Sequence, residues 1–116
     1  MKVVIIEDDR TTALLLKAHF EDRGDTVIPC VNVREALSYL ERELPDVAIV
    51  DVTLPDGDGK KIVEAIRDRP QGARVIVVIY SATDPQSLGQ IQGADVVIQK
   101  SSDLRELLNV TASGKP

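Results

Sequence analysis

The sequence predicts an α/β fold in which a five-stranded parallel sheet is covered by helices on both faces. Short apolar runs rich in valine and isoleucine alternate with amphipathic segments along the chain. Such runs are typical of strands buried on both faces of a parallel sheet, and their alternation with helices favours crossover connections. The 116 residues, 43% hydrophobic and 28% charged, fit one globular domain.

The first strand–helix unit and the second strand follow from periodicity and end signals. Residues 2–6 form an apolar strand, and residues 11–23 form a helix with leucines on adjacent turns. Gly24 ends this helix, because glycine tolerates the left-handed conformation of a helix C-terminus. Residues 26–28 form the second strand. Pro29 closes it, which favours a sheet edge or a strand end.

The middle of the chain predicts two further strands and two helices. A leucine and alanine stripe indicates a helix over residues 33–43, with Asn32 as its N-cap. Residues 47–50 form the third strand, and a helix with inward-facing isoleucines follows over 59–68. Residues 75–79 form the fourth and most apolar strand.

The last part of the chain predicts a weak helix, a strand and a final helix. Asp84 and the proline after it start a helix over residues 85–92 well. Gly89 weakens it, because glycine inside a helix costs about 1 kcal/mol relative to alanine. Residues 96–98 form the fifth strand and residues 103–110 the last helix. We expect the domain to span residues 1–110 and residues 111–116 to form a tail or linker stub.

Composition excludes several classes of function. The net charge of −5 and the absence of a lysine or arginine run argue against direct nucleic-acid binding. No apolar run approaches the roughly 20 residues of a membrane helix, so no membrane partner is expected. Cys30, the single cysteine, can form no internal disulfide, and a cytoplasmic location is the simpler expectation.

Charged and polar residues follow directly on the predicted strands. They are Glu7 and Asp8 after the first strand, Asp51 after the third, Ser81 after the fourth and Lys100 after the fifth. The carboxyl ends of parallel strands meet at one edge of the sheet, where ligands bind in open α/β folds. Converging carboxylates favour Mg²⁺, with Mn²⁺ or Ca²⁺ as alternatives, over zinc. Asp51 is the natural nucleophile toward phosphorus, and Lys100 suits a phosphoryl oxygen.

In these residues the chain resembles the receiver domain of two-component response regulators, which are CheY-like. The resemblance covers essentially the whole length, and it rests on the following segments: Ile6-Glu7-Asp8-Asp9, Val50-Asp51-Val52-Thr53-Leu54-Pro55-Asp56-Gly57-Asp58-Gly59, Tyr80-Ser81-Ala82, Gly93-Ala94-Asp95 and Gln99-Lys100. No single motif is decisive, but the ordered set is specific. The resemblance implies a flavodoxin-like, doubly wound sheet with the strand order 2-1-3-4-5 and five helices.

The resemblance also implies a function and its residues. Asp51 would accept a phosphoryl group from a sensor histidine kinase or a phosphotransfer protein. The Mg²⁺ ligands would be Glu7, Asp8, Asp51 and the backbone carbonyl of Thr53. Ser81 and Lys100 would bind the phosphoryl group, and Ser81 would report it by moving. Such a domain is a switch for an output partner or effector domain rather than an enzyme, apart from slow self-dephosphorylation.

Three departures from the family concern the relay of the signal. In the family a proline usually follows the lysine, and here Ser101 takes its place. The family often carries an aromatic side chain that flips on phosphorylation at the position of Val97. The segment from Asp84 to Gln92 is also short and contains Gly89. The output face built from helix four, strand five and helix five is therefore expected to be small.

The sequence is also compatible with two other functions. A degenerate receiver that binds proteins without phosphorylation is motivated by the same departures. A metal-dependent phosphohydrolase is less favoured, because such enzymes carry a second aspartate two residues after the nucleophile and Thr53 occupies that position. Asp56-Gly57-Asp58-Gly59 is not an EF-hand loop, since that register would begin at Leu54 and end at Ala65.

Overall fold

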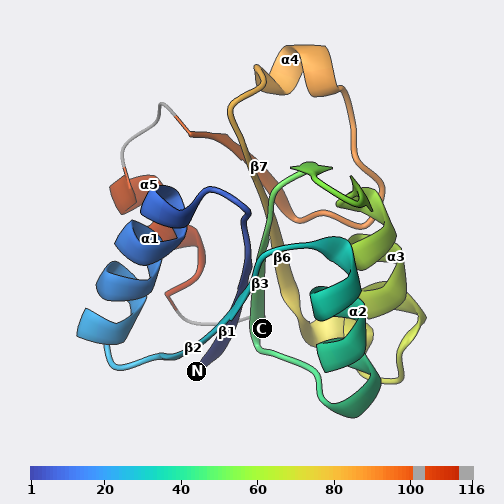
Figure 1. Cartoon of the computed structure of the whole chain (residues 1–116), viewed down its shortest axis with the longest axis horizontal. Helices are drawn as coiled ribbons and strands as arrows, with labels where there is room; N and C mark the ends of the chain where they lie inside the picture. Colours follow the sequence, from blue (N-terminus) through green and yellow to red (C-terminus); the bar gives the residue numbers. More distant parts are fainter. Residues whose placement is uncertain (101–103, 113–116) are drawn as a thin grey trace.

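A five-stranded parallel sheet forms the centre of the computed structural model, which describes residues 1–100 and 104–112 (Figure 1). Its strands are β1 (Lys2–Ile6), β2 (Thr26–Cys30), β3 (Val47–Val50), β6 (Ile76–Ser81) and β7 (Val96–Gln99). Their order is β2-β1-β3-β6-β7, and every neighbouring pair is parallel. The strand order expected from the resemblance is confirmed.

Helices cover both faces of this sheet. They are α1 (Arg10–Asp22), α2 (Val33–Arg42), α3 (Lys60–Asp68), α4 (Pro85–Leu88) and α5 (Leu104–Val110). Figure 1 shows α1 and α5 together on one side and α2 and α3 on the other, with α4 beyond the end of the sheet. A two-stranded antiparallel ribbon of β4 (Thr53–Leu54) and β5 (Gly57–Asp58) follows β3, and a 3₁₀ helix spans Gly72–Arg74.

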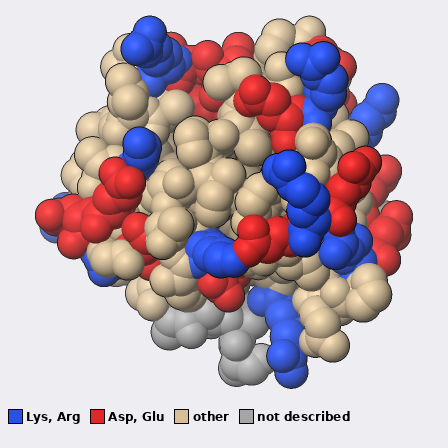
Figure 2. Space-filling model, turned by 60° about the horizontal axis from the view of Figure 1, so that its bottom comes forward, with Lys and Arg blue, Asp and Glu red and all other residues tan. Residues whose placement is uncertain are grey.

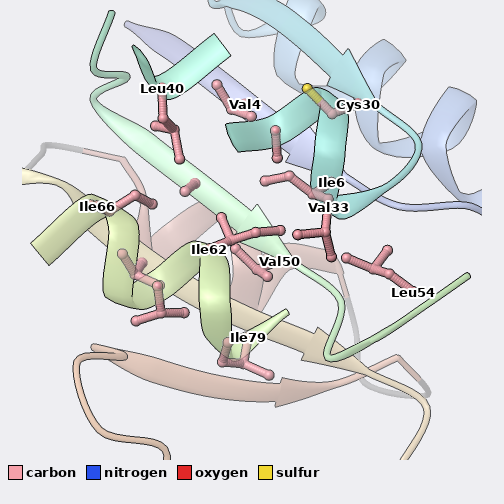
Figure 3. Packing of buried hydrophobic residues seen from close by; sticks show 14 of the residues in the cluster. Val4, Ile6, Cys30, Val33, Leu40, Val50, Leu54, Ile62, Ile66 and Ile79 are labelled. Atoms are coloured by element: carbon pink, nitrogen blue, oxygen red, sulfur yellow. The ribbon is translucent and has the colours of Figure 1, made fainter. Parts of the chain in front are cut away.

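Alternation along the strands divides the core into two clusters, one on each face. Ile6, Val50 and Ile79 belong to the cluster under α2 and α3, where Leu54 of the ribbon closes one end (Figure 3). The cluster under α1 and α5 contains strand residues of the other parity, together with three helix residues: Val3, Ile5, Val47, Ile49, Ile76, Val78, Tyr80, Ile98, Leu16, Phe20 and Leu107. Residues of opposite parity therefore serve opposite faces.

Polar side chains define where three of the described helices begin. Asp9 is the N-cap of α1, because its carboxylate accepts a hydrogen bond from Thr12 N at 3.0 Å. The predicted cap Asn32 accepts from Glu35 N at 2.8 Å. The predicted cap Asp84 starts α4, with Pro85 in its first turn. Each cap satisfies a backbone donor that the helix leaves without a partner.

The structure differs from the sequence expectation mainly around α4. The helix predicted over 85–92 ends at Leu88, because Gly89 adopts φ +68, a left-handed conformation. Strand β6 continues through Ser81, two residues beyond the predicted end. On α1, Leu14 is 55% exposed, whereas Leu16 and Phe20 face the core. Residues 101–103, which include Ser101 and the predicted start of the last helix, lie outside the described residues.

The surface carries interleaved charges on the face that Figure 2 presents, with acidic groups beside most basic groups. This mixture gives that face no single-sign field for a polyanion. Within residues 1–100 and 104–112, none of the helices has the length and apolar character needed to span a bilayer.

Candidate functional site

The backbones of three predicted strand-end residues continue the sheet's hydrogen-bond ladder past the last strand residue. Glu7 N donates to Cys30 O at 3.0 Å, and Asp51 N donates to Ile6 O at 3.1 Å. On the other side, Lys100 N donates to Ser81 O at 2.8 Å. The sheet therefore fixes the main chain at these three residues, and only their side chains remain to be ordered.

Three carboxylates meet at this edge of the sheet. Glu7, Asp8 and Asp51 each offer an oxygen, and these oxygens lie within 4.8 Å of one another. Glu7 is 3% exposed and Asp51 is 7% exposed, whereas Asp8 faces solvent. Burying carboxylates this close together is costly unless positive charge accompanies them.

Lys100 supplies positive charge from the far edge of the sheet. Its Nζ lies 3.0 Å from Asp51 Oδ2 and also forms an ion pair with Glu7 Oε1. Burial by itself lowers the pKa of Lys100, but the bonds to Glu7 and Asp51 outweigh it and raise that pKa. Burial raises the pKa of Glu7, and the hydrogen bond from Lys100 offsets this only in part. Lys100 therefore stays charged, whereas burial disfavours the ionised form of Glu7.

The loop after Asp51 is shaped by close backbone contacts. Thr53 N donates to Asp51 Oδ1 at 3.0 Å, which orients the carboxylate. A Cβ on Gly59 would lie 2.1 Å from the Asp51 carbonyl oxygen, so only glycine fits there. Asp56 accepts hydrogen bonds from the first amides of α2, Val33 N at 2.8 Å and Arg34 N at 3.0 Å. The sequence after Asp51 predicted a loop, but it did not predict the hydrogen bonds that connect Asp56 to α2.

Ser81 lies on the last position of β6 and is 2% exposed. Its Oγ accepts a hydrogen bond from Thr83 N at 3.2 Å, which connects it to the loop before α4. Val97 is half-buried and packs against the cluster under α2 and α3. The predicted residues Glu7, Asp8, Asp51 and Lys100 are thus brought together, and Ser81 adjoins them through the backbone of Lys100.

The acidic cluster fits a small divalent cation. Its donors are carboxylate oxygens, which Mg²⁺ prefers, and the described residues offer no histidine or cysteine ligand in this cluster. Exposed Asp8 leaves one side of the cluster open to water. Mg²⁺ characteristically keeps several waters and shares its site with a phosphate, so an open, partly solvated carboxylate cluster suits it.

The chain matches the family model of the response regulator receiver domain over residues 3–112. This match covers nearly the whole chain, and the chain therefore belongs to the response regulator receiver domain family, a component of two-component systems. The flavodoxin-like fold agrees with this membership, as does the acidic cluster at the carboxyl edge of the sheet.

Several characterised and uncharacterised proteins are similar to this chain. An uncharacterised 14.6 kDa protein of Leptolyngbya boryana is 31% identical over 113 residues, which are 95% of this chain and 86% of that protein. The virulence transcriptional regulatory protein PhoP of Salmonella typhimurium is 37% identical over 109 residues. That match covers 93% of this chain but 49% of PhoP, so the chain spans about half the length of this relative.

Solved structures agree on the fold. A two-component response regulator from Clostridium difficile is 26% identical with a TM-score of 0.82, covering 97% of this chain and 93% of that chain. The receiver domain of the sensor histidine kinase PA1611 from Pseudomonas aeruginosa has a TM-score of 0.82 at 22% identity, covering 95% and 93%. That structure holds a magnesium ion in its active-site cleft; at this identity the similarity to our chain is one of fold.

Proposed function

We propose that this receiver domain is a phosphorylation switch in which Asp51 accepts a phosphoryl group from a sensor histidine kinase or a phosphotransfer protein. One observation carries the proposal. The buried Asp51 carboxylate lies 3.0 Å from a lysine ammonium and belongs to a cluster of three carboxylates that could hold a metal ion. A nucleophile, a phosphoryl-binding cation and a metal site are the parts that phosphoryl transfer needs.

In the proposed reaction, an oxygen of Asp51 attacks the phosphorus of a phosphohistidine. A P–O bond forms as the P–N bond breaks, and the histidine nitrogen leaves with the bonding electron pair and takes up a proton from solvent. Thr53 N donates to Asp51 Oδ1 and Lys100 Nζ donates to Oδ2, so these two hydrogen bonds orient the carboxylate before the attack. Lys100 Nζ, beside Oδ2, would then pair with a phosphoryl oxygen.

The metal proposed for the site is Mg²⁺, with Mn²⁺ as a substitute. When bound, it would neutralise charge on the phosphoryl group and the acceptor. Glu7, Asp8 and Asp51 would hold it with their carboxylates, and Thr53 with its backbone carbonyl. The PA1611 receiver domain, which shares this fold, holds a magnesium ion in its cleft, and this supports Mg²⁺ as the choice of metal.

Ser81 would report the phosphoryl group to the rest of the domain. Its Oγ now accepts a hydrogen bond from Thr83 N. A phosphoryl oxygen on Asp51 is a strong acceptor, so the Ser81 hydroxyl would turn toward it, and this hydrogen bond would break. The loop before α4 would then move, shifting an equilibrium between two surfaces for an output partner.

The decisive experiment treats the full chain with acetyl phosphate and MgCl₂ and measures its intact mass. We expect a gain of one phosphoryl group that Asp51→Asn abolishes. Asp68→Asn, at the exposed end of α3, makes the same charge change far from the site and should leave the gain intact. A gain that persists in Asp51→Asn would refute the assignment of the acceptor.

A null result in the wild type would favour the second function, a degenerate receiver that binds partners without phosphorylation. The four-residue α4 is the observation that supports it, because the relay segment is shorter than the sequence predicted. PhoP is a transcriptional regulator about twice the length of the matched region, so an effector beyond residue 116 is a proposal that follows from this relative. The receiver unit itself is proposed to span residues 1–110.

A further inference from the structure

Tyr80 lies in the middle of the site's row of residues, although no step of the proposed chemistry uses it. The register of the neighbouring strands, continued one residue past β1 and β3, places four residues side by side across the sheet: Glu7, Asp51, Tyr80 and Ile98. Tyr80 therefore stands between Asp51 and the strand that carries Lys100.

These residues also share one face of the sheet. Tyr80 is 6% exposed and packs in the cluster under α1 and α5 together with Ile98. Lys100 follows Ile98 by two residues, and its backbone continues the ladder to β6. Because side chains alternate along a strand, Lys100 leaves β7 on the face that Tyr80 occupies.

The lysine side chain must cross β6 to reach its partners. Asp51 follows β3, which lies two strands from β7, and two strand spacings are about 10 Å. Lys100 Nζ nevertheless lies 3.0 Å from Asp51 Oδ2. The lysine side chain therefore spans the end of β6, on the face of the sheet where Tyr80 lies. Such apolar stems pack favourably on aromatic surface.

The electrostatics of the phenol agree with this placement. Burial raises the pKa of Tyr80, the charge of Lys100 lowers it, and the charge of Glu7 raises it. The phenol of Tyr80 is therefore influenced by both charges that meet at Asp51.

We propose that Tyr80 is a positioning residue whose ring supports the methylene stem of Lys100 where it crosses β6, and so holds the ammonium against Asp51. This inference rests on the proposed phosphoacceptor function. The role proposed for Tyr80 differs from that of the family's aromatic residue at the position of Val97, because Val97 packs on the opposite face of the sheet.

A double-mutant cycle tests the proposal, with the rate of phosphorylation by acetyl phosphate and Mg²⁺ as the readout. Tyr80→Ala should slow phosphorylation by about tenfold, since a displaced cation loses its orientation toward the phosphoryl group. In a Lys100→Ala background the same change should cost less than about twofold, because no lysine remains to be positioned. Tyr80→Phe, which keeps the ring, should stay within about twofold of wild type.

Val78→Ala is the matched control, because Val78 is fully buried on the same face of the same strand, two residues from Tyr80. Its effect should be small and independent of Lys100. If the effects of Tyr80→Ala and Lys100→Ala multiply, the positioning role is refuted while the phosphoacceptor function stands. If the wild type takes up no phosphoryl group, the proposed function fails instead.

Fluorescence gives a second test that needs no truncation in the core. The chain has two tyrosines and no tryptophan, so Tyr80 is the only fluorophore in Tyr39→Phe. Adding MgCl₂ to this variant should change the emission, because the cation competes with Lys100 for the carboxylates. The change should disappear when Lys100→Met is added. An emission change that survives the loss of Lys100, or no change in Tyr39→Phe, would overturn the proposal.

Discussion

Replacing Lys100 by methionine should destabilise the domain and make its stability depend more strongly on Mg²⁺. Methionine keeps the length and apolar character of the stem but removes the charge. The carboxylates of Glu7 and Asp51, which are 3% and 7% exposed, then stay buried without the ammonium group that pairs with them. Leaving a buried charge unpaired typically costs about 3 to 5 kcal/mol.

The expected loss is smaller than that range because the site is partly wet. The side chain of Lys100 is 21% exposed, and neighbouring Asp8 faces solvent, so water screens part of the interaction. We therefore expect the free energy of unfolding at neutral pH to fall by about 2 to 3 kcal/mol. With a urea m-value near 1.5 kcal/mol per M, the midpoint should fall by about 1.3 to 2 M.

Urea titrations followed by circular dichroism, with and without MgCl₂, measure both effects. At tenfold excess over its dissociation constant, a ligand stabilises by about 1.4 kcal/mol. The gain at one MgCl₂ concentration should be larger in Lys100→Met, because the cation no longer competes with the lysine. Lys61→Met, an exposed change on α3, should match wild type throughout. Equal midpoints for Lys100→Met and wild type, or equal gains from Mg²⁺, would show that the ion pairs contribute nothing.

Four further outcomes are expected in the same urea assay or in simple labelling. Glu7→Gln should raise the midpoint at neutral pH without metal. Burial raises the pKa of Glu7 above the usual 4.5, so the free energy of unfolding of the wild type falls as the pH rises through that pKa. The variant should lose this pH dependence, and it should bind Mg²⁺ less tightly. Gly59→Ala should cost about 3 kcal/mol, because its Cβ would meet the Asp51 carbonyl oxygen at 2.1 Å; a cost below 1 kcal/mol, about that of a mild backbone effect, would contradict this contact. Tyr39→Phe should leave stability unchanged or raise it by up to about 1 kcal/mol, since the buried Tyr39 hydroxyl has no hydrogen-bond partner among the described residues; a loss would reveal one. Burial raises the pKa of Cys30 to about 11, so about one thiol in a thousand is ionised at pH 8, and a thiol reagent should label the chain quickly only in urea; rapid labelling of folded protein would refute the burial.

The sheet could be predicted from the sequence because its strands are buried on both faces. Runs such as Val47–Val50 contain only apolar residues and pack into both clusters, so burial alone identifies them. Pro29 predicted either an edge strand or a strand end. The structure has the edge strand, since β2 pairs only with β1, but the predicted end was wrong, because β2 continues through Cys30. The ribbon of β4 and β5 was missed because each strand has two residues, too few for a period-two pattern.

The sequence predicted which residues lie at the site, but it did not predict the contacts between them. Charges that end apolar runs identified Glu7, Asp51 and Lys100, and parallel strands brought them to one edge. The sequence does not show that Lys100 spans two strands to reach Asp51, nor that Tyr80 stands between Asp51 and the strand that carries Lys100. Those facts follow from the register, which long-range pairing sets and local patterns do not contain.

The short α4 changes how a signal from Ser81 would travel. In the described structure α4 is a single turn with no buried residue, held by its Asp84 cap and a bond from Gly89 N to Pro85 O. Isolated helical turns are marginal, so this turn depends on its anchors. Thr83, which donates to Ser81 Oγ, immediately precedes the Asp84 cap. Breaking that hydrogen bond would therefore act directly on the start of α4, and local unfolding of one turn, rather than rotation of a rigid helix, is the lower-energy response.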